Sequence, residues 1–121
     1  MMTNEPSVRV VATPHFNRIF KRLRKKYRRI ESDLKPLITQ LERGETPGDQ
    51  IQRVKFTVYK TRIASSDAQR GKSGGYRVIY YLKTSEFIFL VDIYPKSERD
   101  DISTDNLRRL IEAVEAELPD E

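Results

Sequence analysis

The sequence predicts an α+β fold, an antiparallel sheet with an αα-hairpin packed on one face and a C-terminal helix. Three observations predict it. Apolar residues recur at helical spacing from about residue 14 to residue 43, apolar and polar residues alternate in three later segments, and a last helical pattern begins near Asp105. The predicted order is therefore β-α-α-β-β-β-α, with the helices packed on one face of the sheet.

The chain has 121 residues, so we expect one domain over residues 1–121, with a frayed N-terminus at residues 1–7. It contains no Cys, no apolar stretch at residues 1–7 and no apolar run long enough for a membrane span. These absences exclude disulfides and thiolate chemistry and indicate a cytoplasmic protein. One His and no Cys also speak against a transition-metal site, so we expect no metal and no cofactor.

The first helix is predicted to begin at Pro14, directly after a short strand at residues 8–11. Thr13 is the expected N-cap, because Thr accepts a hydrogen bond from the first turn and Pro suits the first helical position. His15 lies in that first turn and is interpreted as a surface residue. The helix has one apolar stripe, formed by Phe16, Ile19, Phe20, Leu23 and Tyr27.

The start of the second helix can be placed in two ways. Either Ser32 or Asp33 caps it and puts Pro36 in the first turn, or it begins near Tyr27 and Pro36 kinks it. Gly44 is predicted to follow its end, because helices commonly finish on a glycine with positive φ.

Three strands are predicted at residues 54–64, 76–82 and 87–94, with a hairpin turn between the last two. The polar, glycine-bearing residues 45–52 and 65–75 are interpreted as loops. Tyr80 and Tyr81 point to opposite faces of their strand, so at most one of them is expected in the core.

Basic residues outnumber acidic ones and are unevenly distributed. There are 23 Lys and Arg against 18 Asp and Glu, a net charge of +5, and five acids with no base follow Ile111. The excess positive charge therefore lies in the rest of the chain, which attracts a polyanion, and we expect RNA. Eight cations cover the polar side of the first helix and are interpreted first as a solvated face and second as phosphate contacts: Arg18, Lys21, Arg22, Arg24, Lys25, Lys26, Arg28 and Arg29.

Four cations on or beside the predicted strands form the candidate site. Lys60 and Arg62 share one face of their strand, Arg77 lies on the next strand, and Lys96 follows the third. If the three strands pair in sequence order, these side chains meet in one patch with no carboxylate among them. Like charges on a sheet repel each other, which indicates that an anion such as a phosphate binds there. The alternative is a set of solubilising residues on an open sheet face.

Three segments resemble the RelE/ParE superfamily of toxins from type II toxin–antitoxin systems. They are Tyr59-Lys60-Thr61-Arg62, Gly74-Gly75-Tyr76-Arg77-Val78-Ile79-Tyr80-Tyr81 and Ile93-Tyr94-Pro95-Lys96-Ser97-Glu98. The spelling is closest to the HigB-like branch of RelE, and the resemblance covers residues 8–118. It implies the RelE-like microbial RNase fold and a metal-independent mRNA interferase, which cuts the message in the ribosomal A site and inhibits translation.

The resemblance also implies roles for individual residues, in a reaction in which a 2′-hydroxyl attacks the adjacent phosphate. By motif position Lys60 is the candidate base, and Arg62 and Arg77 stabilise the charge of the transition state. Lys96 is a leaving-group acid or a phosphate contact. Contacts to RNA or the ribosome are expected from Arg70, Lys72, Lys25, Lys26 and Tyr94.

The sequence departs from the RelE pattern after the last strand. Where RelE members carry an Arg and a Tyr, this chain has Ser97 and Ser103, and it has no His there, unlike YoeB-type members. The resemblance therefore assigns no general acid, and Tyr94 is the candidate substitute for the stacking partner.

Three functions stay open: a ribosome-dependent endoribonuclease, a ParE-like inhibitor of DNA gyrase, and an RNA- or ribosome-binding protein without catalysis. Retention of Lys60, Arg62 and Arg77 favours the first, because ParE-like action does not need that trio. Any toxin of this superfamily implies a cognate antitoxin, expected to cover the basic face or displace the last helix. The acidic residues 112–121 are interpreted as a solvated helix end, with an intramolecular cap of the basic body as the alternative.

Overall fold

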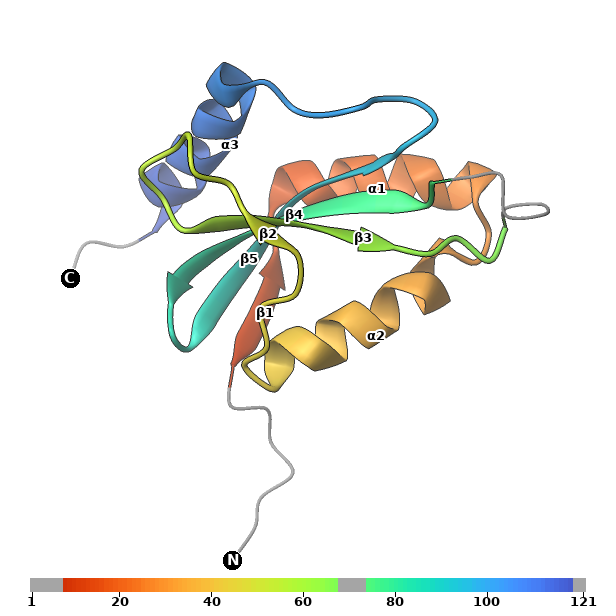
Figure 1. Ribbon diagram of the computed structural model, residues 1–121, viewed down its shortest axis with the longest axis horizontal. Helices are drawn as coiled ribbons and strands as arrows, with labels where there is room; N and C mark the ends of the chain where they lie inside the picture. The colour runs from red at the N-terminus through yellow and green to blue at the C-terminus, as the bar shows by residue number, and fades with distance from the viewer. Residues whose placement is uncertain (1–7, 68–73, 119–121) are drawn as a thin grey trace, which may run out of the picture.

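A computed structural model describes residues 8–67 and 74–118 of the chain (Figure 1). The N-terminal residues 1–7, expected to be frayed, and the expected RNA-contacting residues Arg70 and Lys72 lie outside this described part. The elements are β1 (Arg9–Ala12), α1 (Pro14–Lys26), α2 (Ile30–Glu42), β2 (Asp49–Gln50), β3 (Val58–Ile63), β4 (Tyr76–Thr84), β5 (Phe87–Pro95) and α3 (Thr104–Glu117). The α+β class is confirmed.

The sheet is mixed rather than antiparallel. Its strand order is β1-β5-β4-β3-β2, and every neighbouring pair is antiparallel except β1 and β5, which run parallel from Arg9 opposite Phe87 to Ala12 opposite Leu90. The expectation of a purely antiparallel sheet was therefore wrong at one edge. No turn joins β1 to β5, and a pairing so distant along the chain leaves no local signal in the sequence.

Helices cover both faces of the sheet, which corrects the expectation that they pack on one face. The α1–α2 hairpin packs on the face that carries Val78 and Tyr80, and α3 packs on the opposite face, against Ile79 and Tyr81. Figure 1 shows the sheet between α2 and α3. Both Tyr80 and Tyr81 are consequently buried. The expectation that only one of them lies in the core was wrong, because it treated one face as solvated.

The helix ends follow the capping signals in part. The backbone N of Phe16 donates to Thr13 Oγ1 at 3.1 Å, so Thr13 caps α1 as predicted. Helix α2 begins at Ile30 with no side-chain cap, which makes the predicted start at Ser32 or Asp33 wrong and leaves Pro36 inside the helix. The Asp33 carboxylate instead accepts from the backbone N of Ser66, at 2.9 Å, and fastens the loop after β3 to α2.

The segment before β3 differs most from its prediction. Asp49 and Gln50, expected in a loop, form the short strand β2, which pairs with Lys60 and Tyr59 at the sheet edge. The strand expected from residue 54 begins only at residue 58. The apolar side chains before it, Val54 and Phe56, pack against the core beneath α3. Their alternating pattern therefore reflects burial under α3 and not strand pairing.

Two further boundaries agree with the sequence. Gly44, with φ 87°, follows the C-cap of α2 as predicted. Helix α3 begins at Thr104, one residue before the predicted start, and Ser103 caps it by accepting from the backbone N of Asn106 at 3.1 Å. Within residues 8–67 and 74–118, no helix is long and apolar enough to cross a membrane.

Candidate functional site

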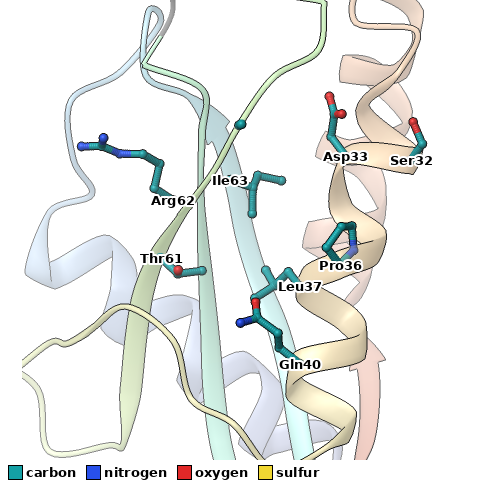
Figure 2. Close-up of a pocket in the computed structure, with 9 residues that line it drawn as sticks. Ser32, Asp33, Pro36, Leu37, Gln40, Thr61, Arg62 and Ile63 are labelled. Atoms are coloured by element: carbon teal, nitrogen blue, oxygen red, sulfur yellow. The ribbon is translucent and has the colours of Figure 1, made fainter.

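A row of three side chains crosses the central strands of the sheet. Arg62 of β3 lies opposite Arg77 of β4, and Arg77 lies opposite Tyr94 of β5. Opposed residues of neighbouring strands share a face, and Tyr94 belongs to the core beneath α3, so the row lies on the α3 side of the sheet. In Figure 2 the side chain of Ile63 points toward α2, whereas Arg62 points away from the groove between α2 and β3. Arg62 is exposed and Arg77 is half-buried.

The glycine pair before β4 holds Arg77 in place. Arg77 Nη1 donates to the carbonyl oxygen of Gly74 at 2.7 Å. Gly75 has φ 75°, and a Cβ there would collide with the carbonyl oxygen of Ile63. A Cβ on Gly74 would come within 2.7 Å of Lys96 Cγ. Only glycine therefore permits the close packing that fixes the Arg77 guanidinium at this end of the sheet.

Arg62 and Arg77 have no carboxylate partner in the part of the chain that the structure describes. Neighbouring strands are about 4.8 Å apart, so the two guanidinium groups start from adjacent positions. Two unpaired cations this close repel each other unless an anion lies between them. Arg62 and Arg77 are therefore cations without a carboxylate among the described residues, as the sequence predicted for all four cations of the candidate site.

The other two predicted cations do have carboxylate partners, so the expectation of a cluster free of acids was wrong. Lys60 Nζ lies 3.1 Å from Asp101 Oδ1, and Lys96 Nζ lies 2.7 Å from Asp100 Oδ1. Both acids belong to the segment between β5 and α3, which folds back toward β3. Strand alternation describes β3 to β5 only, and it contains no information on where that segment goes.

Asp101 is the more firmly held of the two acids. Its carboxylate also lies 3.6 Å from Arg53 Nη2 and accepts from the backbone N of Ile102 at 2.8 Å. Burial alone would raise the pKa of Asp101, but the hydrogen bonds from Ile102 and Lys60 and the charges of Lys60 and Arg53 together lower it. Asp101 is therefore a fixed anion beside Lys60.

The ion pair of Lys96 with Asp100 is weaker than that of Lys60 with Asp101. The Asp100 side chain is 90% exposed, although the hydrogen bond from Lys96 lowers its pKa. Exposed ion pairs of this type contribute little to stability and give way easily to another anion. A phosphate can therefore replace Asp100 at Lys96 easily. At Lys60 it can bind only after the firmly held Asp101 has moved.

Tyr94, an expected RNA contact, is buried rather than exposed. The residue is 2% exposed, and its hydroxyl has no hydrogen-bond partner in the described part of the chain. Burial raises the pKa of Tyr94, and Asp101 and Asp92 add to the effect while Arg99 and Arg77 oppose it. The phenol is therefore neutral near pH 7, and an unsatisfied donor remains beside the basic row.

Three residues at this end of the molecule were not selected from the sequence as site residues. The Arg99 guanidinium lies 4.2 Å from the centre of the Tyr94 ring, and its Nη2 lies 3.2 Å from Asp92 Oδ2. Asp92 is fully buried and also contacts His15, Nε2 to Oδ1, at 3.3 Å. The interpretation of His15 as a plain surface residue was therefore wrong. One signal was available: an Asp inside an apolar strand needs partners.

The two lysines expected to bind RNA from α1 differ in their surroundings. Lys26 Nζ lies 3.4 Å from Glu98 Oε2, which ties α1 to the segment after β5. Lys25 is exposed and, with Arg24, Arg28 and Glu31, lines a cleft of about 550 Å³ at the C-terminal end of α1. Of these two lysines, Lys25 is the one free of an ion pair within the described residues.

Among residues 8–67 and 74–118, no group of three His, Asp or Glu side chains could hold a metal ion. Comparison with protein families matches residues 13–118 to the model of the RelE toxin of the RelE/RelB toxin–antitoxin system. Comparison with curated proteins finds no match. The match leaves open the HigB-like assignment within the superfamily.

Proposed function

The chain belongs to the RelE toxin family, and from this premise we propose that it is a ribosome-dependent endoribonuclease that cuts messenger RNA. Membership in the family implies a toxin with a cognate antitoxin; cleavage of the message is the proposed activity. The observation that carries it is the pair Arg62 and Arg77, adjacent across β3 and β4 and without a carboxylate partner among the described residues.

The proposed reaction uses the RNA as its own nucleophile, in the cytoplasm and in the ribosomal A site. The 2′-hydroxyl oxygen bonds to the adjacent phosphorus as its proton passes to a water molecule. The bond from phosphorus to the 5′ oxygen breaks, and that oxygen takes up a proton from water. The products are a 2′,3′-cyclic phosphate and a free 5′-hydroxyl, and no metal or cofactor is required.

Arg62 and Arg77 are proposed to stabilise the transition state. Negative charge grows on the non-bridging oxygens of the pentavalent phosphorus, and a planar, permanently charged guanidinium can donate two hydrogen bonds to them. The bond from Arg77 Nη1 to Gly74 fixes one of these groups before substrate arrives, so it needs no reorganisation during the reaction. Removing one such donor typically costs about 10²- to 10³-fold in rate.

Lys60 and Lys96 are proposed to bind the RNA backbone, with a phosphate replacing the aspartate that each lysine pairs with. For Lys96 this exchange replaces a mostly exposed Asp100. For Lys60 it replaces Asp101, an anionic partner whose place a phosphate oxygen can take. We therefore assign Lys60 to charge stabilisation instead of the base role implied by motif position.

A translation reaction with purified protein tests this function. Mapping the message ends with and without the protein should reveal cuts within codons that bear a cyclic phosphate and a 5′-hydroxyl, and that persist in EDTA-treated protein preparations. Naked message should be cut more slowly than message on ribosomes. An intact message, together with loss of gyrase supercoiling in a parallel assay, would instead support the ParE-like function.

A second candidate is an RNA- or ribosome-binding toxin without catalysis. Asp100 and Asp101 favour it, because two acids among four cations weaken the field at the site and no general acid is assigned. The same reaction separates the two functions. A catalyst cuts many messages per protein molecule, whereas a binder stops translation only at stoichiometric amounts and leaves every message intact.

A further inference from the structure

We propose that Arg99 is a further RNA-contacting residue of this site, and that Asp92 positions it to bind the same phosphodiester as Arg77. The inference rests on the proposed function and deepens it by naming a third guanidinium group. Arg99 belongs to no motif that the sequence singled out. Its place in the structure, and not its place in the chain, points to the role.

Arg99 extends the row that crosses the sheet. Tyr94 lies opposite Arg77 in the register of β4 and β5, and Arg99 stacks on the Tyr94 ring at 4.2 Å. The charges of Arg77 and Arg99 both act on the Tyr94 phenol. The row of Arg62, Arg77 and Tyr94 therefore ends under a third guanidinium on the same face of the sheet.

A tight turn aims Arg99 back at the sheet. The backbone N atoms of Glu98 and Arg99 both donate to the carbonyl oxygen of Pro95, at 3.0 and 3.2 Å. Lys96 N donates to the carbonyl oxygen of Gly75 at 2.9 Å, which ties the same turn to the start of β4. Arg99 is thus held by backbone hydrogen bonds next to the residues that hold Arg77.

The Asp92 carboxylate fixes the orientation of the guanidinium. Asp92 is fully buried, and a buried carboxylate without cationic partners is strongly unfavourable, so the contact to Arg99 Nη2 at 3.2 Å is a constrained one. His15, at 3.3 Å, holds the other carboxylate oxygen. One edge of the Arg99 guanidinium therefore contacts Asp92, and the guanidinium carbon lies over the Tyr94 ring.

The rest of the guanidinium remains available for an anion. Nη1 and Nε of Arg99 have no acceptor in the described part of the chain, and the side chain is 38% exposed. These free guanidinium donors, beside Arg77, fit the non-bridging oxygens of a phosphodiester.

Steady-state cleavage of ribosome-bound message by single variants tests this assignment. Arg99→Ala should lower kcat on the order of 10²-fold, the cost typical of one lost transition-state donor. Arg99→Lys keeps the charge but not the planar fork, so its kcat should fall between those of Arg99→Ala and wild type. Arg108→Ala removes an exposed Arg that pairs with Asp105 on α3, and it should leave kcat unchanged.

A double-mutant cycle tests the positioning role of Asp92. If Asp92 acts through Arg99, Asp92→Asn should lower kcat in the wild-type background and have no further effect in Arg99→Ala. A merely structural role would lower kcat by the same factor in both backgrounds. Circular-dichroism melts check that each variant is folded. If Asp92→Asn does not fold, Asp92→Glu, which keeps the charge but displaces the carboxylate, takes its place in the cycle.

The outcomes separate this inference from the proposed function. Wild-type kinetics in Arg99→Ala, with clear cleavage by the wild type, would overturn the role of Arg99 and leave the nuclease standing. If the wild type cuts no message, the proposed function fails, and the role of Arg99 is decided by fluorescence anisotropy with a labelled single-stranded RNA oligonucleotide. Weaker binding by Arg99→Ala than by Arg108→Ala then supports the contact, and equal binding overturns it.

Discussion

Lys60 and Asp101 lie 3.1 Å apart, although one belongs to β3 and the other to the segment between β5 and α3. The contact places a carboxylate where the proposed reaction needs a phosphate. Asp101 also lies near Arg53, at 3.6 Å, so one acid engages two cations. The protein therefore carries an internal anion at the edge of its own basic site, and RNA has to compete with it.

This competition predicts that Asp101→Asn binds RNA more tightly than wild type. The amide keeps the shape of the carboxylate but releases the charge of Lys60 and Arg53, and a gain of about 1 kcal/mol, roughly fivefold in Kd, is expected. Fluorescence anisotropy with a labelled single-stranded RNA measures it. Asp105→Asn, a matched change on α3, should leave Kd unaltered. Equal affinity of Asp101→Asn and wild type would contradict the competition.

The role of Lys60 can be decided by two substitutions. If its function is charge stabilisation, Lys60→Arg should retain cleavage within about tenfold of wild type, whereas Lys60→Met should lose about 10²-fold. An arginine cannot act as a general base near neutral pH. Single-turnover cleavage rates compare the two. Inactivity of both variants to the same extent would restore the base role implied by motif position.

Gly75 should be the least replaceable residue of the turn before β4. Its φ of 75° costs a residue with a side chain about 1–2 kcal/mol, and the collision with the Ile63 carbonyl adds to this. Gly75→Ala should therefore lower the free energy of unfolding by more than about 2 kcal/mol. Urea denaturation measures the loss. Gly44→Ala, with φ 87° but open space around the new Cβ, should lose only the backbone cost.

Glu115 should make the attachment of α3 sensitive to acid. Its carboxylate accepts from the Tyr81 hydroxyl at 2.7 Å and from Lys83 at 2.9 Å, and these hydrogen bonds lower the pKa of Glu115 from its ordinary 4.5. A depressed pKa contributes stability that is present above the unfolded value and is lost as pH falls through the folded value. Wild type should therefore lose about 1 kcal/mol between about pH 6 and pH 3 that Glu115→Gln does not lose.

Urea midpoints over that pH range compare the two proteins. A wild-type curve parallel to that of Glu115→Gln would rule out this contribution. Burial raises the pKa of Tyr81, so its hydroxyl stays protonated and remains a donor throughout the range.

The arrangement of Arg62 and Arg77 could be predicted from the sequence because it depends on strand alternation and on the pairing of consecutive strands. Both are local properties of β3, β4 and β5. The same reasoning failed for Lys60 and Lys96, because their partners Asp100 and Asp101 come from a segment whose path no periodicity describes. Strand periodicity therefore predicts where the cations lie, whereas only the tertiary structure shows that Asp100 and Asp101 pair with two of them.

Burial on two faces explains the other differences. Tyr81 was interpreted as though the α3 side of the sheet were solvated, whereas α3 covers part of it. The alternation that includes Val54 and Phe56 was interpreted as a strand, whereas these side chains are packed beneath α3 outside any strand. The parallel pairing of β1 with β5 and the contact of Arg99 with Asp92 join residues that are distant in sequence or follow no repeat. A lone Asp in an apolar strand indicated that a partner exists without identifying it.

The rate of message cleavage by Arg77→Ala tests the central claim most directly. Arg77 is half-buried, fixed by Gly74 and free of carboxylates among the described residues, so its removal should lower single-turnover cleavage on ribosomes by about 10²-fold or more. Arg108→Ala serves as the matched control, and an unchanged melting temperature shows that both variants are folded. A wild-type cleavage rate in Arg77→Ala would contradict the account.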